Sequence, residues 1–210
     1  KLRDDSIREA DHIFTECNLY QQKLSNIIGN PIRATTLYIF RDQSLDEYIL
    51  VQQKIKEIEK GKKKHISIAY LGSINNIIDI DGICRIMDAL IKAGYSTEVR
   101  VIGNGENTEY FLSKLEWNGA RVIYYGEIYN QIKKIELLAS CDYALNMMKN
   151  STTIGLTIKS VDYLSMGIPL LNNVRGDTWE LVKKWKIGIN IDQNFSTFSE
   201  DLQKKIDRKK

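Results

Sequence analysis

A lysine and a carboxylate stand one helical turn apart in the stretch GLTIKSVDYLSMGIPLLNN, residues 155–173. Thr157 can cap a helix through its hydroxyl, and the amides that follow Gly155 would then form an anion site at the start of that helix. Lys159 adds a positive charge suited to phosphate, and the Asp162 carboxylate could accept hydrogen bonds from the vicinal hydroxyls of a ribose. This combination is typical of a nucleotide-sugar site. The alternative is a surface ion pair between Lys159 and Asp162.

Three other loops follow predicted strands and contain glycine, where the backbone can approach a ligand closely. Their candidate donor-binding residues are Gly72, Ser73, Asn75, Gly103, Asn104, Gly105, Gly126 and Ile128. In each loop the alternative is a simple turn, and in the first of them Asp79 would then cap the next helix. The Gly-x-Gly pair lacks the third glycine of a dinucleotide fingerprint, because Thr108 stands in its place, which disfavours NAD.

Apolar strands and amphipathic helices alternate about six times between residues 65 and 192. Strands are expected within 66–72, 96–105, 120–128, 141–148, 168–173 and 187–192, and helices within 80–93, 108–117, 129–139 and 177–184 and from about Thr157. The pattern predicts an α/β fold with a doubly wound parallel sheet, whose ligands sit at the carboxyl ends of the strands.

The rest of the chain divides into shorter parts. Residues 1–42 predict one unit of a second α/β sheet, with a helix and strand in READHIFTEC, a helix in NLYQQKLSNII and a strand in RATTLYIF. Residues 43–64 predict a lysine-rich linker, whose lysines 60–64 could alternatively contact a membrane surface or phosphate. Residues 193–210 predict a C-terminal helix. Because the chain does not begin with Met, we expect it to be a fragment of a longer protein.

Composition excludes several classes of function. The 210 residues carry a net charge of only +3, too little to argue for nucleic acid. Three widely spaced cysteines and two histidines predict neither a metal site nor disulfides, and favour a cytoplasmic protein. The sequence shows no signal peptide and no apolar run long enough to span a membrane.

The series YLGSIN, VIGNGE, YYGEI, CDYALNMM and GLTIKSVDYLSMGIPLLNN, in this order within residues 65–192, resembles the C-terminal half of GT-B fold glycosyltransferases of the retaining family 4 type. The resemblance implies a Rossmann-like domain that binds a nucleotide-diphosphate sugar, and it makes residues 1–42 the remnant of an N-terminal acceptor domain. It also implies hexosyl transfer with retention, without a metal, to a saccharide or lipid-linked acceptor. The expected setting is bacterial polysaccharide or capsule assembly, in the cytoplasm or at the inner face of the membrane.

By this resemblance Asp162 takes the place of the glutamate that holds the donor ribose, one methylene shorter. Thr157, Lys159 and Tyr163 match a GLTNK…EY variant of the same motif. The family's glycine loop and base-reading loop are matched by Gly103 and Gly105 and by Gly126 and Ile128.

The sequence departs from the family pattern at three positions. Ser73 and Asp81 stand where an arginine and a lysine usually grip the diphosphate, and Ile154 replaces the first glutamate of the usual pair. We assign no catalytic residue and expect this chain alone to be inactive. The alternatives are a non-catalytic GT-B fold subunit, a nucleotide-sugar epimerase-like protein, or a simpler phosphate-binding Rossmann-like module.

Overall fold

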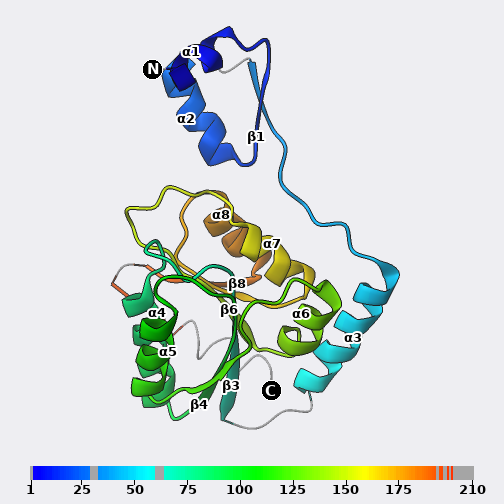
Figure 1. Cartoon of the computed structure of the whole chain (residues 1–210), viewed down its shortest axis with the longest axis vertical. Coiled ribbons are helices and arrows are strands. Elements are labelled where there is room, and N and C mark those ends of the chain that lie inside the picture. The colour runs from blue at the N-terminus through cyan, green and yellow to red at the C-terminus, as the bar shows by residue number, and fades with distance from the viewer. Residues whose placement is uncertain are drawn as a thin grey trace.

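A six-stranded, all-parallel sheet is the centre of the larger unit (Figure 1). The computed structural model describes residues 2–28, 33–59 and 64–192, and then 194, 195, 198 and 200. The sheet consists of β3 (His65–Leu71), β4 (Ser96–Ile102), β5 (Arg121–Tyr124), β6 (Tyr143–Asn146), β7 (Leu170–Asn172) and β8 (Gly188–Asn190). Their spatial order is β5-β4-β3-β6-β7-β8. The order reverses between β3 and β6, which is where sheets of this kind bind ligands.

Helices cover both faces of this sheet, as predicted for a doubly wound fold. They are α3 (Leu45–Glu59), α4 (Ile80–Lys92), α5 (Thr108–Trp117), α6 (Gln131–Leu138), α7 (Ile158–Ser165) and α8 (Asp177–Trp185). On one face α4 and α5 bury Met87 and Phe111, and on the other α3, α6 and α7 bury Val51, Leu138 and Tyr163. The central strands β3 and β6 are mostly apolar on both sides because both faces are covered, whereas β4 carries Glu98 and Arg100.

Two helix ends show how local sequence sets the element boundaries. Asp79 caps α4 as predicted, since its Oδ1 accepts a hydrogen bond of 2.9 Å from the amide of Gly82. At the other end Gly94 has a φ of +83°, and the amides of Gly94 and Tyr95 donate to the carbonyls of Ile91 and Leu90. This pair of bonds is a Schellman motif, in which Gly94 ends the helix.

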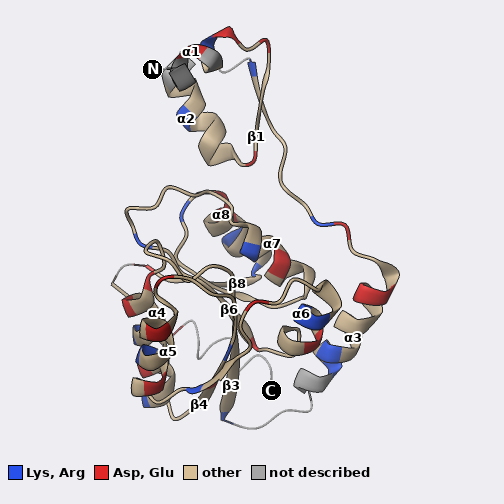
Figure 2. Cartoon of the chain, viewed as in Figure 1, with Lys and Arg blue, Asp and Glu red and all other residues tan. Residues whose placement is uncertain are grey.

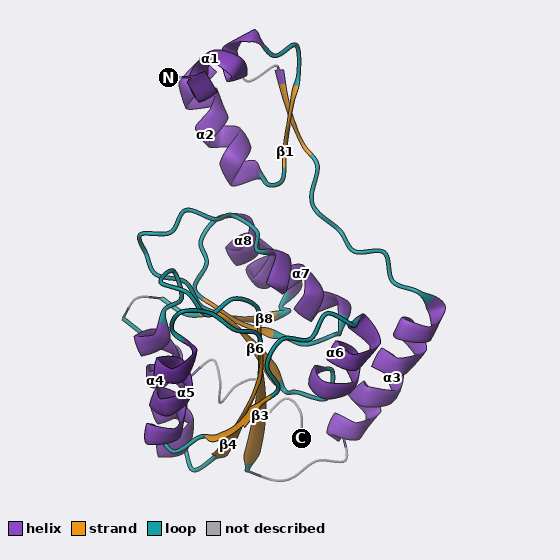
Figure 3. Ribbon diagram, viewed as in Figure 1, coloured by secondary structure: helices purple, strands orange, loops and turns teal. Residues whose placement is uncertain are grey.

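The N-terminal part contains the second α/β unit that the sequence predicts. Its elements are α1 (Leu2–Glu9), β1 (Ile13–Thr15), α2 (Asn18–Ile28) and β2 (Ala34–Thr36), and the two strands pair in parallel. Residues 37–44 then run as an extended connection to α3 (Figure 3).

The expectation of a linker over residues 43–64 is wrong for most of that range, because α3 occupies it. Ser44 and Glu47 form a capping box, in which the Glu47 amide donates to Ser44 Oγ and the Ser44 amide to Glu47 Oε2, each at 3.2 Å. Val51 is 3% exposed, and Ile55 would touch any Cβ added at Gly167. The helix therefore packs into the core that the sheet forms with α6 and α7.

Two further predictions fall largely on residues outside the described part. The lysines at 60–64 lie outside it except for Lys64, and so does most of the C-terminal helix expected within 193–210. Among the described helices, none has the length and apolar character needed to cross a membrane.

Candidate functional site

A pocket of about 350 Å³ opens at the carboxyl ends of β3 and β4, beside the first turn of α7. It brings together seven of the twelve predicted donor-binding residues, which are Gly72, Ser73, Gly103, Asn104, Ile128, Lys159 and Asp162. Its size lies within the range of small-ligand sites, and its position is the switch point of the strand order. The pocket therefore lies where a doubly wound sheet places its ligand.

Lys159 gives the pocket an ammonium group that has lost most of its hydration. Its Nζ lies 5.1 Å from the centroid of the Tyr70 ring, and its Cδ passes 4.0 Å from the position of a Cβ added at Gly72. Within the described chain this ammonium makes no hydrogen bond or ion pair. Desolvation lowers the pKa of Lys159 to about 8, although the residue keeps some solvent contact through the pocket. A buried, unpaired cation is unfavourable unless an anion joins it.

The start of α7 adds two amide donors next to this ammonium. Thr157 caps the helix as predicted, accepting a hydrogen bond of 3.2 Å from the Ser160 amide. The amides of Ile158 and Lys159 precede any intrahelical acceptor, and no other described group accepts from them. Two free amides and one cation are the elements of a phosphate site.

A row of buried amides fixes this helix start to the sheet. The Thr157 hydroxyl donates to Asn146 Oδ1 at 2.9 Å, and Asn146 Nδ2 donates to Asn172 Oδ1 at 2.7 Å. Asn172 Nδ2 donates in turn to Asn190 Oδ1 at 2.8 Å. These asparagines end β6, β7 and β8, so the amide row joins three strands to the cap of α7.

Asp162 faces the pocket from the next turn of α7, but it does not pair with Lys159. Its Oδ1 accepts a hydrogen bond of 3.0 Å from Arg41 of the connecting segment. Among the described residues no group donates to its Oδ2. The structure thus contradicts the alternative of a Lys159–Asp162 surface pair, and it leaves one carboxylate oxygen available beside the pocket.

The first two glycine loops interlock, which explains their sequence independently of a ligand. A Cβ on Gly103, whose φ is +136°, would come to 2.0 Å from the carbonyl oxygen of Gly72. A Cβ on Gly105 would come to 2.4 Å from the carbonyl oxygen of Ile74. The Ile74 amide also donates to the Asn104 carbonyl at 3.0 Å. The Gly-x-Gly spacing is therefore required for packing one loop against the other.

Five predicted donor-binding residues lie outside the pocket lining, namely Asn75, Gly105, Gly126, Gly155 and Thr157. Thr157 is only 6% exposed and acts through its cap. Gly155 is buried against the N-terminal unit, where an added Cβ would meet Sγ of Cys17. The Gly126 carbonyl accepts a hydrogen bond of 2.8 Å from the Gly103 amide, so Gly126 stabilises a loop that lines the pocket.

Sequence reasoning missed several residues of the site. The pocket is also lined by Glu127, Tyr129, Lys134 and Ile158. Lys134 is a second cation at the pocket, contributed by α6. Tyr129 and Ile158, both in the lining, are large apolar side chains that are 82% and 67% exposed. Tyr129 directly follows Ile128 in the sequence, and this could have indicated that it also lines the pocket. No local sequence pattern indicates that Lys134 does.

The three departures from the family pattern have clear positions. Ser73 is exposed in the pocket, where its carbonyl accepts a hydrogen bond of 2.8 Å from the Tyr70 hydroxyl. Asp81 is exposed in the first turn of α4, and Ile154 packs against the core. None of the three brings a cation to the pocket, whose described lining holds two, Lys159 and Lys134. Figure 2 shows that α7 carries both signs of charge.

The N-terminal unit contacts the larger unit through a buried carboxylate. Asp177, at the start of α8, accepts hydrogen bonds of 2.9 Å from the amides of Asn18 and Leu19, which begin α2. It also accepts a bond of 2.7 Å from the hydroxyl of Tyr38. Burial opposes ionisation of Asp177, but these hydrogen bonds outweigh it and hold the pKa of the carboxyl below its usual value. The contact between the two units therefore places a carboxylate at the positive, N-terminal end of the α2 dipole.

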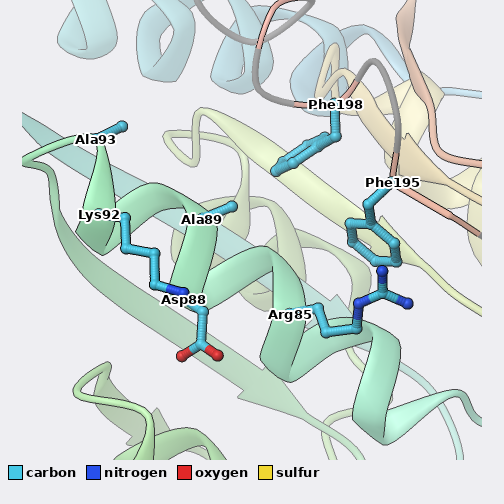
Figure 4. A pocket seen from close by; sticks show the side chains of 7 residues that line it. All are labelled: Arg85, Asp88, Ala89, Lys92, Ala93, Phe195 and Phe198. Carbon is cyan, nitrogen blue, oxygen red and sulfur yellow. The ribbon is translucent and has the colours of Figure 1, made fainter.

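A second hollow, of about 500 Å³, lies on the outer side of α4, between that helix and Phe195 and Phe198 (Figure 4). The Arg85 guanidinium stacks 4.0 Å from the Phe195 ring centroid. Its described lining contains no strand end and no glycine loop, so it does not share the geometry of the predicted site. Within the described residues no group of three or more His, Cys, Asp and Glu side chains could hold a metal ion.

Comparison with solved structures identifies the fold. The lipopolysaccharide outer core galactosyltransferase WaaB matches with a TM-score of 0.68 at 14% identity, covering 92% of this chain and 52% of that chain. Anabaena Alr3699/HepE in complex with UDP matches with a TM-score of 0.65 at 13% identity, covering 96% and 56%. TarM matches at 0.65 and 10% identity, covering 99% and 39%.

The fold is that of GT-B glycosyltransferases. The predicted fold class is thereby confirmed, and the chain spans about half the length of most of these structures. At these identities the likeness shows the fold and nothing finer. No protein-family model and no curated protein sequence matches the chain.

Proposed function

We propose that this chain forms the donor-binding half of a glycosyltransferase that uses a nucleotide-diphosphate sugar. The observation that carries the proposal is the pocket at the strand-order switch, which Ile158, Lys159 and Asp162 all line. Within the described chain the Lys159 ammonium has no carboxylate partner and the amides of Ile158 and Lys159 have no acceptor. Cation and amides suit a diphosphate, and the carboxylate suits the hydroxyls of a ribose. Among the proteins of the same fold, HepE has been crystallised with UDP and with UDP-glucose.

In the proposed reaction the sugar leaves the diphosphate and is transferred to an acceptor hydroxyl. Negative charge grows on the diphosphate as the glycosidic bond breaks, and Lys159 with the amides of Ile158 and Lys159 would stabilise it. The low polarity around Lys159, which depresses its pKa, would strengthen that attraction. We assign no general acid or base.

The finer features of the proposal come from the resemblance. They are membership of the family 4 type, a hexosyl donor, retention of configuration, and a saccharide or lipid-linked acceptor in bacterial surface-polysaccharide or capsule assembly. Residues 1–42 would belong to an acceptor domain, and this chain alone would not complete the reaction. The expected location is the cytoplasm, with peripheral contact to the inner face of the membrane through the lysines at 60–64.

Calorimetric titration of the chain with UDP, GDP, CDP and dTDP sugars tests the proposal. We expect one nucleotide class to bind, and Lys159→Ala and Asp162→Ala each to lower its affinity at least tenfold. Matched controls are Lys149→Ala, an exposed lysine in the loop that precedes α7, and Asp88→Ala on the outer side of α4. Equal affinity in the Lys159 and Lys149 variants, or no binding by the wild-type chain, would contradict the proposal.

A non-catalytic subunit of the same fold remains the second candidate. It is favoured by the absence of a cation at Ser73 and Asp81, the two exposed positions where the resemblance implies an arginine and a lysine that grip the diphosphate. The epimerase-like alternative is less well supported, because neither histidine lines the pocket. His12 contacts Thr35 in the N-terminal sheet, and His65 contacts Ser96 at the opposite end of β3. Nucleotide-sugar binding by a full-length protein without any sugar transfer would favour the subunit.

A further inference from the structure

The connection between the two α/β units reaches the candidate donor site through one side chain. Arg41 lies in the extended segment between β2 and α3, which Figure 3 shows crossing from one unit to the other. Its Nη1 donates to Asp162 Oδ1 at 3.0 Å, across 121 positions of sequence. Asp162 lines the pocket, whereas Arg41 is not among the lining residues.

Arg41 is itself held in place by α3. Its Nη2 lies 3.1 Å from Glu47 Oε1, and the other oxygen of Glu47 accepts the Ser44 amide in the capping box of α3. Gln43 adds a hydrogen bond of 3.0 Å to the carbonyl of Ser165, at the end of α7. The guanidinium therefore bridges two carboxylates on two helices, with only about a fifth of its own surface exposed.

This geometry determines what Asp162 can offer a ligand. A carboxylate on the side of a helix can rotate about its Cβ–Cγ bond, and the charge-assisted bond to Arg41 restricts that rotation. With Oδ1 engaged, Oδ2 is left without a donor in the described chain, on a residue that lines the pocket. The planar fork of arginine suits this bridging role, whereas a lysine ammonium cannot reproduce it.

We propose that Arg41 is a positioning residue for the Asp162 carboxylate, fixing it so that one oxygen accepts the ribose hydroxyls of the donor. The proposal rests on the proposed function, since it assumes a nucleotide in the pocket. It gives the inter-unit segment a part in recognising the sugar of the nucleoside. A merely structural Arg41 would support folding and would have no effect on the distinction between ribose and deoxyribose.

The test compares UDP, GDP and CDP with their 2′-deoxy forms by calorimetric titration of the whole chain. For the nucleotide that binds, we expect the wild type to favour the ribose form about tenfold or more, because a hydrogen bond to a charged acceptor is lost in the deoxy form. In Arg41→Gln the preference should fall to within about threefold. In Arg41→Lys it should fall to an intermediate value. The control Arg121→Gln, an exposed arginine paired with Glu98, should keep the wild-type preference.

The outcomes distinguish a failure of the proposed function from a failure of the proposed role of Arg41. If the wild type binds none of the diphosphates, the proposed function fails and the role of Arg41 fails with it. If the wild type binds and Asp162→Asn loses the ribose preference while Arg41→Gln and Arg41→Lys keep it, the donor site stands and the positioning role is overturned. Tighter binding in both Arg41 variants would also overturn it, because Arg41 would then compete with the ligand for the carboxylate.

Discussion

Replacing Lys159 with methionine should make the folded protein more stable and, at the same time, poorer at binding nucleotide. Methionine has a similar unbranched stem and no charge, so it fills the same space without requiring hydration. The pKa of the Lys159 ammonium is about 8 in the folded chain, against 10.5 for an unperturbed lysine. That difference corresponds to about 3 kcal/mol of unfavourable free energy for keeping the side chain charged in the fold at pH 7.

The sign of the pH dependence follows from the same two values. Below pH 8 the side chain is protonated in both the folded and the unfolded chain, so the full penalty applies. Between pH 8 and 10.5 the unfolded chain binds more protons than the folded one, and the free energy of unfolding of the wild type therefore rises with pH. In Lys159→Met this rise should be missing.

Urea unfolding at pH 7, 8, 9 and 10 measures both effects. We expect Lys159→Met to be more stable than the wild type at pH 7 by up to about 3 kcal/mol, and the two to converge as the pH approaches 10. In parallel, titration at pH 7 with the nucleotide that the wild type binds should show at least a tenfold loss of affinity. A parallel pH dependence in the two proteins, or a less stable Lys159→Met at every pH, would refute the description of Lys159 as a desolvated cation without a carboxylate partner in the described chain.

Three further changes test the scaffold of the site. Thr157→Val should lower the free energy of unfolding by about 1–2 kcal/mol, because it removes the α7 cap and the bond to Asn146, whereas Thr157→Ser should be nearly neutral in the same urea unfolding. Gly103→Ala should lower the free energy of unfolding by more than about 2 kcal/mol, and Gly94→Ala by about 1 kcal/mol. Both glycines have positive φ, but of the two only Gly103 lacks space for a Cβ. Equal losses would contradict the interlocking of the two glycine loops. Asp177→Ala should expose the amides that begin α2 to hydrogen exchange. In the wild type the stability that this carboxylate contributes should be lost as the pH falls through its lowered pKa. Unchanged protection of these amides in the variant would exclude the contact between Asp177 and α2.

The sheet was predictable because burial on two faces leaves a plain mark on the sequence. Strands such as ISIAYLG are apolar except for Ser67. The helix from Ile80 shows one apolar stripe, with Asp79 before it and Gly94 after it. The carboxyl ends of the predicted strands were sufficient to place the site at that edge of the sheet. The α3 helix was overlooked because its lysines suggested a linker, although the Ser44–Glu47 capping box was visible in the sequence.

The details of the site were harder to foresee, because they depend on which way each group points. The cap at Thr157 was correct, but the pattern could not show that its hydroxyl turns toward Asn146. A helical spacing of three left a Lys159–Asp162 surface pair open as the alternative, yet the Lys159 stem passes close to Gly72 and Asp162 pairs with Arg41. A contact across 121 positions leaves no local trace in the chain.

The asparagines that end β6, β7 and β8 have a consequence for how this protein would respond to its surroundings. Side-chain amides and a threonine hydroxyl gain and lose no protons over the ordinary range of pH, so the support beneath α7 keeps its hydrogen bonds in acid and in mild alkali alike. The ammonium that they carry into the pocket, in contrast, becomes neutral near pH 8. Alkalinity would thus weaken the attraction for an anion, while the shape of the receiving surface stays the same.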